Sequence, residues 1–282
     1  TGHVDLTAFS AKAADVTLVK PSGRIGFDGT AKQTRGQIDL AAAAVQRGDI
    51  RSARTELTGA FQVAPTRSGM DARIDGALSA NRLAMAGPDP LAGLRASTAG
   101  SPVAPLAIRF ADAVRAASRD NPAQARFSMA QKRATGSATI TAADFTSRSG
   151  ARAGLGQGSS VKLDWPKAGG GLGWALNGSV TTDGGGLPRA ALRLAQRPGG
   201  GLAGQLFVDP YTARGARLAL EPVRFSAGAG GITRFTTAIR LDGPLDGGAV
   251  RGLALPVAGQ VAANGTLTVN PRCAPLTLDS LK

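Results

Sequence analysis

The chain has little of the chemistry on which most enzymes and metal sites depend. It contains one histidine, His3, and one cysteine, Cys273, so an intrachain disulfide is excluded. Cys273 has no second cysteine or nearby histidine, which argues against a zinc site or an activated thiolate. Acidic pairs such as Asp71 and Asp75 lie on one polar strand face, where carboxylates usually serve solubility. We therefore predict that the chain is not an enzyme and uses no cofactor and no metal.

Long hydrophobic runs are also missing. No stretch reaches the roughly 18 apolar residues that a membrane-spanning helix needs, and no signal peptide is visible. Strand-like sequence lies at both ends, directly after Thr1 and again from Leu276 to Leu281. We therefore expect a piece of a longer protein, with its targeting signal outside this sequence.

Aromatic residues are scarce as well. They make up 4% of the chain, whereas apolar residues make up 43% and there are 39 glycines. Alanine and glycine fill little volume, so a thick and closely interlocked core is not expected. A thin sheet with one shallow apolar face needs less filling and fits this composition better.

Charge of one sign dominates, with 33 basic against 19 acidic residues and a net charge of +14. This excess permits nucleic acid, an anionic membrane surface or an acidic partner. However, no run of five basic residues and no interleaved stacking aromatics occur, so we predict no nucleic-acid partner. Arginines instead occupy the polar side of expected strands, as Arg24, Arg73, Arg193 and Arg240 do. A solvated surface is favoured, followed by a general preference for anionic lipid head groups.

The strongest pattern is strict two-residue alternation. Between Gly69 and Asn81, apolar or small residues occupy every second position and mostly polar residues occupy the others. The apolar or small set is Met70, Ala72, Ile74, Gly76, Leu78 and Ala80. A strand places the two sets on opposite faces, whereas a helix would scatter them. Similar runs recur between Gly- or Pro-rich turns such as 21–23, 183–186 and 198–200, which predicts consecutive antiparallel hairpins.

Several of these runs are about nine residues long, or roughly 30 Å, which exceeds the usual strand length. Because twist accumulates, many such strands must close on themselves, fold into a sandwich or coil as an elongated groove. We predict an all-β fold, a long curled antiparallel meander sheet in the form of an elongated β-groove. One short amphipathic helix is expected within it.

That helix is predicted between Ser101 and Arg119, with Ser101 as N-cap and Pro102 in the first turn. Its apolar face would hold Leu106, Phe110, Val114 and Ala117. A loop over 87–100 precedes it. The expected organisation is a first β-groove block over 1–100, a helical insertion over 101–121 and a second block over 122–282 that continues beyond the sequence. A connector that plugs one end of the sheet is favoured over a binding helix.

Two stretches resemble a known family. The first is Gly100–Ala117, in which a small residue is followed by PVAPLA and the amphipathic helix. The second is Leu241–Leu278, with its GPL turn, its GLALP step, a strand ending in VN and the segment CAPL. These features resemble YdbH-type proteins, members of the wider AsmA-like and TamB-like group of bacterial envelope proteins. The two stretches cover about a fifth of the chain.

The resemblance implies a repeating β-groove with an apolar concave face, located in the periplasm and anchored in the inner membrane by a helix outside this sequence. It implies phospholipid as the ligand and a role in moving phospholipid between the inner and outer membranes. The two membranes would be engaged through parts outside this sequence, and the resemblance allows a partner protein in the outer membrane. The family supplies no catalytic residues.

An acyl-chain track needs continuous apolar surface, worth about 0.8 kcal/mol per buried CH₂, and few polar contacts. The candidate lipid-binding residues are Ile25, Phe27, Ile38, Leu40, Ile74, Leu78, Leu163, Leu176, Val180, Leu192, Leu194, Leu206, Ile239, Leu241 and Leu267. The same residues could instead pack on a second sheet or on the helix, as in a sandwich core. A structural or adhesive repetitive β protein of the cell envelope or surface therefore stays open as the alternative function.

Overall fold

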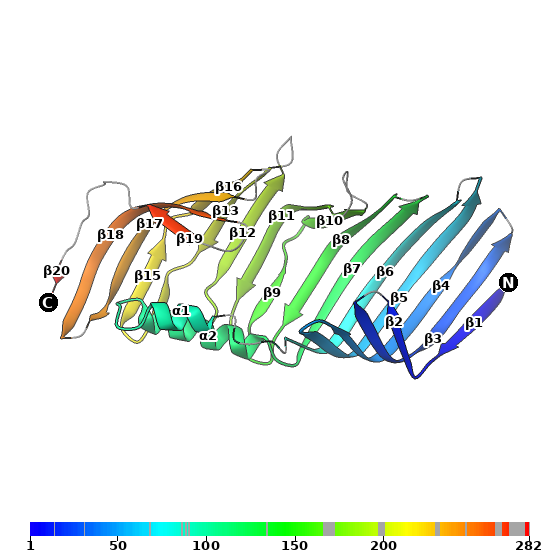
Figure 1. Ribbon diagram of the computed structural model, residues 1–282, viewed down its shortest axis with the longest axis horizontal. Helices are drawn as coiled ribbons and strands as arrows, with labels where there is room; N and C mark the ends of the chain where they lie inside the picture. The colour runs from blue at the N-terminus through cyan, green and yellow to red at the C-terminus, as the bar shows by residue number, and fades with distance from the viewer. Residues whose placement is uncertain are drawn as a thin grey trace. The chain divides into compact units, whose positions relative to one another are not determined.

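A computed structural model describes residues 1–281 except 14, 31, 68, 86, 88, 90, 134, 166–172, 197–200, 229–231, 246, 263–266 and 271–279. Most of the described residues lie in β-strands, as Figure 1 shows, so the predicted all-β class is confirmed. In the described part, no helix is long and apolar enough to cross a membrane. Contacts divide the chain into unit 1, residues 1–87, 118–148 and 154–176, and unit 2, residues 88–117, 149–153 and 177–282. The two units are described separately.

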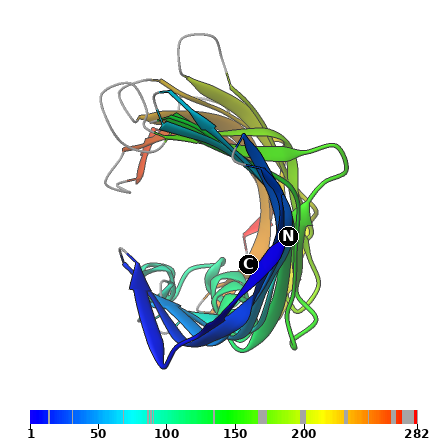
Figure 2. The ribbon, with the colours of Figure 1, turned by 90° about the vertical axis from the view of Figure 1, so that its right-hand side faces the viewer.

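Unit 1 is a single antiparallel ladder. Its strands are β1 (Gly2–Thr7), β2 (Ser10–Ala13), β3 (Val16–Thr30), β4 (Gln33–Arg47), β5 (Ile50–Thr66), β6 (Gly69–Met85), β7 (Asn121–Lys132), β8 (Thr135–Thr146) and β10 (Ser160–Trp165). From β3 to β8 each strand pairs with the next one, which is the predicted meander. At one edge β1 and β2 both pair with β3, and at the other edge β10 pairs with β8. The long strands of this unit curve along their length in Figure 2.

A row of left-handed residues crosses unit 1 within β3, β5 and β6. Lys20, Arg54 and Arg82 have φ of 46°, 50° and 55°. The half-buried apolar residues of β3 stand at even positions before Lys20, as Leu18 does, and at odd positions after it, as Ile25 does. A left-handed residue interrupts the side-chain alternation of a strand, so apolar residues on both sides of this bend can share one face.

The turn predicted at Pro21-Ser22-Gly23 is wrong, because these residues lie inside β3. Lys20 carries the chain through the bend, and Pro21 pairs with Ala42 of the neighbouring strand. On its other side Pro21 faces the break between β1 and β2, where its carbonyl accepts the Ala8 N–H. Proline is tolerated at such irregular strand positions because no donor is needed there.

Unit 2 is also antiparallel, but it departs from a simple meander. Its strands are β12 (Ala190–Gln196), β13 (Leu202–Val208), β14 (Tyr211–Ala213), β15 (Ala216–Leu220), β16 (Val223–Ala227), β17 (Thr233–Leu245), β18 (Gly248–Val261), β19 (Leu267–Asn270) and β20 (Ser280–Leu281). β13 pairs with β16, and the short β14–β15 hairpin lies between them in the chain. β17 pairs with β16 along its first half and with β15 along its second half. The remaining strands, β9 (Arg152–Leu155) and β11 (Gly173–Asp183), contain boundaries between the units.

Unit 2 also contains two helices, α1 (Ala92–Ser97) and α2 (Ala104–Ala117). α2 is the predicted amphipathic helix, although it begins after Ser101, whose hydroxyl donates to Thr98 O instead of capping it. The loop predicted over 87–100 is wrong in part, because α1 lies within it. The division into units also differs from the predicted blocks, since β7, β8 and β10 group with the strands before residue 87.

Candidate functional site

Seven of the eight predicted apolar residues of unit 1 lie on one face of its ladder. Directly opposed residues of an antiparallel pair share a face, so the register identifies the whole set. One row across the strands runs through Val4, Ile25, Ile38, Gly59, Gly76, Phe127, Ile140 and Val161. The next row runs through Phe27, Gly36, Phe61, Ile74, Met129, Ala138 and Leu163. A third joins Leu40, Leu57, Leu78 and Ala125.

This apolar face of unit 1 is partly open to solvent. Phe27 is 37% exposed and Leu78 is 39% exposed, and most other members of the three rows are half-buried. All described strands of the unit belong to one ladder, so the unit supplies no second sheet to cover the face. The face is therefore a shallow apolar surface, as the shortage of large side chains predicts.

Aromatic rings on this face lie over glycines of neighbouring strands. A Cβ added to Gly36 would lie 2.5 Å from the ring of Phe61, and one added to Gly76 would lie 3.2 Å from the ring of Phe127. The same arrangement pairs Trp165 with Gly136 and Phe27 with Gly2 in unit 1, and Phe225 with Gly204 and Phe235 with Gly259 in unit 2. Each ring fills the space that the glycine leaves, which is a known stabilising device in sheets. The rings consequently lie low on the surface.

The opposite face of unit 1 carries the charges. Ion pairs join Arg24 to Asp5 at 2.7 Å, Arg73 to Asp75 at 2.9 Å and Lys162 to Asp164 at 3.1 Å. The hydrogen bond from Arg24 lowers the pKa of the Asp5 carboxyl. All these side chains are well exposed, so they contribute solubility more than stability.

Unit 2 has an apolar face of the same kind. Its register joins Val180, Leu192, Leu206 and Val223 in one row, and Leu194, Gly204, Phe225, Phe235 and Gly259 in the next. Ile239 and Leu241 follow Phe235 at two-residue steps on β17 and therefore share that face. Six of the predicted lipid-binding residues are thus brought together: Val180, Leu192, Leu194, Leu206, Ile239 and Leu241.

Helix α2 covers part of this face. Leu106 of α2 packs against Ala213, Ala216 and Leu241, with Ile239 at the margin of the cluster. Leu241 is only 8% exposed, so in this arrangement it is covered by protein and not by a ligand. The helix buries mainly alanines, Ala107, Ala111, Ala113 and Ala117, whereas the predicted Phe110 and Val114 are half-buried.

Two of the predicted lipid-binding residues, Leu176 and Leu267, are not among the residues of these apolar faces. Leu176, on β11, is 5% exposed and so lines no open surface. Leu267 begins β19 and is opposite Val261, but its side chain lies outside the described part of the structure. Cys273 lies outside the described residues as well.

Polar contacts fix α2 beside the β14–β15 hairpin. Arg109 donates to Thr212 O at 2.6 Å, and its guanidinium lies 5.3 Å from the centre of the Tyr211 ring. The Tyr211 hydroxyl donates to Gly186 O at 2.6 Å. Burial raises the pKa of Tyr211, and the neighbouring Arg109 opposes this effect. The tyrosine is therefore a neutral hydrogen-bond donor at ordinary pH.

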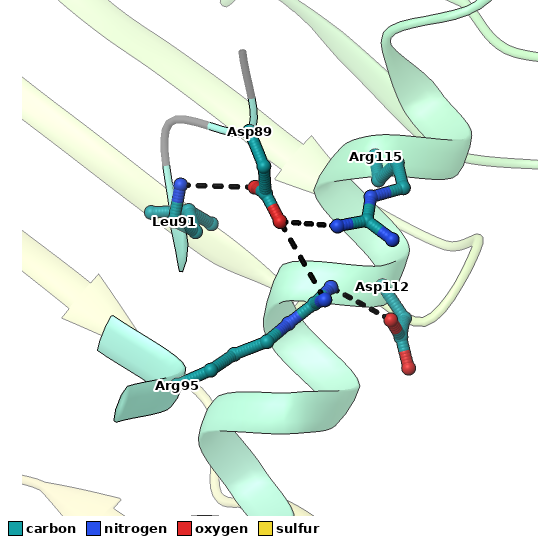
Figure 3. Close-up of polar contacts among 5 residues, drawn as sticks. All are labelled: Asp89, Leu91, Arg95, Asp112 and Arg115. Atoms are coloured by element: carbon teal, nitrogen blue, oxygen red, sulfur yellow. Dashed lines mark hydrogen bonds and ion pairs between the residues drawn. The ribbon is translucent and has the colours of Figure 1, made fainter. Parts of the chain in front are cut away.

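A second polar cluster, shown in Figure 3, joins α1 to α2. The Asp89 carboxylate accepts the Leu91 N–H at 3.0 Å and pairs with Arg115 and with Arg95, the latter at 3.5 Å. Arg95 also pairs with Asp112 at 2.8 Å. The hydrogen bond from Leu91, followed by the one from Arg115, lowers the pKa of Asp89. This cluster has no reactive group and holds a six-residue helix that could not persist alone.

The sequence interpretation missed several residues that the register places on the same faces. They are Leu57, Phe61, Phe127, Met129 and Ile140 in unit 1 and Leu202 and Phe225 in unit 2. Their alternation with polar neighbours is the signal that could have found them. Within the described residues, no group of three or more His, Cys, Asp or Glu side chains is arranged to hold a metal ion.

Comparison of the chain with protein-family models, with curated proteins and with solved structures finds no match. The resemblance to YdbH-type envelope proteins therefore stays a prediction.

Proposed function

We propose that the apolar faces of the two units bind the acyl chains of phospholipids. The chain would be part of a periplasmic protein, anchored in the inner membrane by a segment outside this sequence, that shields lipid on its way between the inner and outer membranes. The observation that carries the proposal is the apolar face of unit 1, where seven predicted residues fall in register: Ile25, Phe27, Ile38, Leu40, Ile74, Leu78 and Leu163.

The energetics of such a face suit an acyl chain. Partly exposed Phe27 and Leu78 keep apolar area in contact with water, and each methylene that covers such area gains about 0.8 kcal/mol. The three rows of the face contain only apolar side chains and glycine, and the polar Gln131 lies outside them, next to Trp165. An acyl chain can therefore lie along these rows without desolvating a hydrogen-bonding side chain. Binding would depend on covered area and little on the identity of the lipid.

Neighbouring residues of one strand supply a matched test. A photo-crosslinking amino acid at Phe127 would lie on the apolar face of unit 1, and the same group at Arg126 would lie on the charged face. After irradiation in Gram-negative cells, mass spectrometry of the purified protein should find phospholipid attached at position 127 and none at position 126. Leu78 and Ser79 provide a second such pair on β6.

The structural or adhesive alternative predicts the opposite outcome. If the apolar face is covered by another protein layer in the cell, the crosslinker at position 127 should capture protein and no lipid. Equal lipid labelling at positions 126 and 127 would also count against the proposal, because it would indicate general contact with a membrane.

A further inference from the structure

At the bend of unit 1, where Arg54 and Arg82 adopt left-handed backbone angles, lies a hollow lined by positive charges, and the proposed binding of lipid on the apolar face gives it no role. Its volume is about 650 Å³, and it is lined by Ala43, Ala53, Arg54, Asn81, Arg82, Asp120, Pro122 and Arg148. We propose that this hollow, here called the arginine hollow, binds a phosphate-type oxyanion. The site is separate from the acyl-chain face, so the inference stands without the proposed lipid function.

The hollow lies on the charged side of the ladder. Ala43 follows Asp39 and Ala41 at two-residue steps, and Pro122 precedes Gln124 in the same way. Along β4, Asp39 and Ala41 alternate with Leu40 of the apolar face, and along β7, Gln124 alternates with Ala125 of that face. A ligand in the arginine hollow would therefore not compete with one on the apolar face.

The backbone at this place is unusual for its residues. Arg54 and Arg82 adopt φ of 50° and 55°, in the left-handed region that glycine enters freely. A residue with a Cβ adopts it at a cost of about 1–2 kcal/mol. Neither arginine is a short polar residue that gains a local turn contact there. Strained backbone positions cluster at functional sites, and here both strained arginines line one hollow.

The charges in the hollow are unbalanced. Three guanidinium groups, those of Arg54, Arg82 and Arg148, share the hollow with one carboxylate, that of Asp120. Asp120 pairs with Arg82 at 3.5 Å. In the described part of the chain, no carboxylate forms an ion pair with Arg54 or Arg148. Two positive charges therefore remain to attract an anion.

The frame that carries these arginines is fixed by buried polar contacts. The Asn121 side chain is fully buried, and its Oδ1 accepts the backbone N–H of Arg148 at 3.2 Å. The hydroxyls of Ser52 and Thr55 hydrogen-bond at 2.6 Å across Arg54, which holds the backbone on both sides of it. The small side chains of Ala43 and Ala53 leave the space between the arginines open.

Phosphate fits this arrangement chemically. Guanidinium groups present several N–H donors in a planar fork that matches phosphate oxygens, and such charge-assisted bonds are stronger than neutral ones. The Asn81 amide could donate a further hydrogen bond from the rim. The same chemistry serves a free phosphate ester and a lipid head group, and the test below separates these two sources.

The test uses the complete chain at low salt, with inorganic phosphate and glycerol phosphate as probes in calorimetry. The variant Arg54→Gly removes one charge at a position whose backbone favours glycine, so it should fold, and Arg148→Gln removes a second. The double variant should weaken phosphate binding at least about tenfold, since charge-assisted hydrogen bonds are lost. Arg126→Gln, on the same face but outside the hollow, is the charge-matched control for Arg148→Gln alone and should leave the affinity within about twofold, whereas Arg148→Gln should lower it further.

Absence of saturable phosphate binding, or an equal loss in the Arg126→Gln control, would overturn the proposal. Sedimentation with phosphatidylcholine vesicles, with and without phosphatidylglycerol, then identifies the source. Vesicle binding that needs phosphatidylglycerol and both arginines assigns the site to lipid head groups. Phosphate-ester binding without vesicle binding assigns it to a soluble ligand.

Discussion

Unit 1 and unit 2 use the same strand pattern but differ in what covers the apolar face. In unit 1 the face belongs to one ladder, and side chains such as Leu78 stay partly exposed. In unit 2 the helix α2 lies on the sheet and buries Leu106 and Leu241. Alternation alone makes an apolar face, whereas burial of that face requires a second layer. Unit 1 should therefore owe more of its stability to strand pairing, and unit 2 more to packing.

The largest expected effect follows from the covered face of unit 2. Leu106→Ala leaves a cavity in a cluster where the side chain is 4% exposed, so it should lower the free energy of unfolding by about 2–5 kcal/mol. Leu78→Ala in unit 1 removes the same atoms from a half-open surface and should cost about 1 kcal/mol. Urea unfolding of both variants measures the difference. Equal losses would contradict the contrast between the units.

A second prediction concerns the rings that lie over glycines. Phe127→Ala uncovers Gly76 and removes cross-strand contact, so we expect a loss of about 1–2 kcal/mol in unfolding free energy. Phe127→Leu, which keeps apolar area without a flat ring, should restore about half of it. A loss no greater than that of Ser128→Ala, a control on the opposite face of β7, would show that the contact contributes nothing.

The third prediction is a substitution that raises the free energy of unfolding, whereas most substitutions lower it. Arg54→Gly relieves the left-handed strain at φ 50°, so stability should rise by about 0.5–1 kcal/mol despite the greater freedom of the unfolded chain. Arg54→Val, a β-branched residue that resists this conformation, should lower it. Melting temperatures of the two variants provide the comparison. A stabilising Arg54→Val would exclude the strain explanation.

The smallest expected effect concerns the polar cluster that holds α1. The folded-state pKa of Asp89 is lowered from 3.8, so its stabilising contribution is fully present above that value and is lost as pH falls through the lower folded pKa. Asp89→Asn should mimic this loss at neutral pH by weakening the pairs with Arg95 and Arg115. Faster hydrogen exchange in α1, with unchanged exchange in β17, is the expected readout. Uniformly faster exchange would mean that Asp89 supports the whole of unit 2.

Much of the fold could be predicted from the sequence because alternation has a direct geometric meaning. The apolar set of β6, from Met70 to Ala80, pairs in register with apolar or small partners on β5 along its whole length. Seven of the eight predicted residues of unit 1 fall on one face for the same reason. Their role in binding lipid is still a prediction.

The missed features depend on contacts between distant residues. α1 has six residues, too few for a periodic signal, and it is held by Asp89 and α2. The alanine Ala113 of α2 faces the turn that contains Gly186, where the two backbones approach closely. A Cβ at Gly186 would lie 3.2 Å from the Ala113 Cβ, which leaves little space for larger side chains. The bend at Lys20 was misread as a turn at Pro21, since proline and glycine mark both.

The sequence by itself determined the strand class, the antiparallel hairpins and which residues share a face, because side-chain direction in a strand alternates with a period of two. The tertiary structure alone decided which apolar residues are covered. Leu241 and Leu78 have similar sequence surroundings, yet only Leu241 lies under a helix. It also decided that three arginines share one hollow, because strand pairing brings Arg54 and Arg82 together and the contact with Asn121 holds Arg148 beside them. Alternation is local, whereas coverage and charge clustering depend on which strands and helices become neighbours.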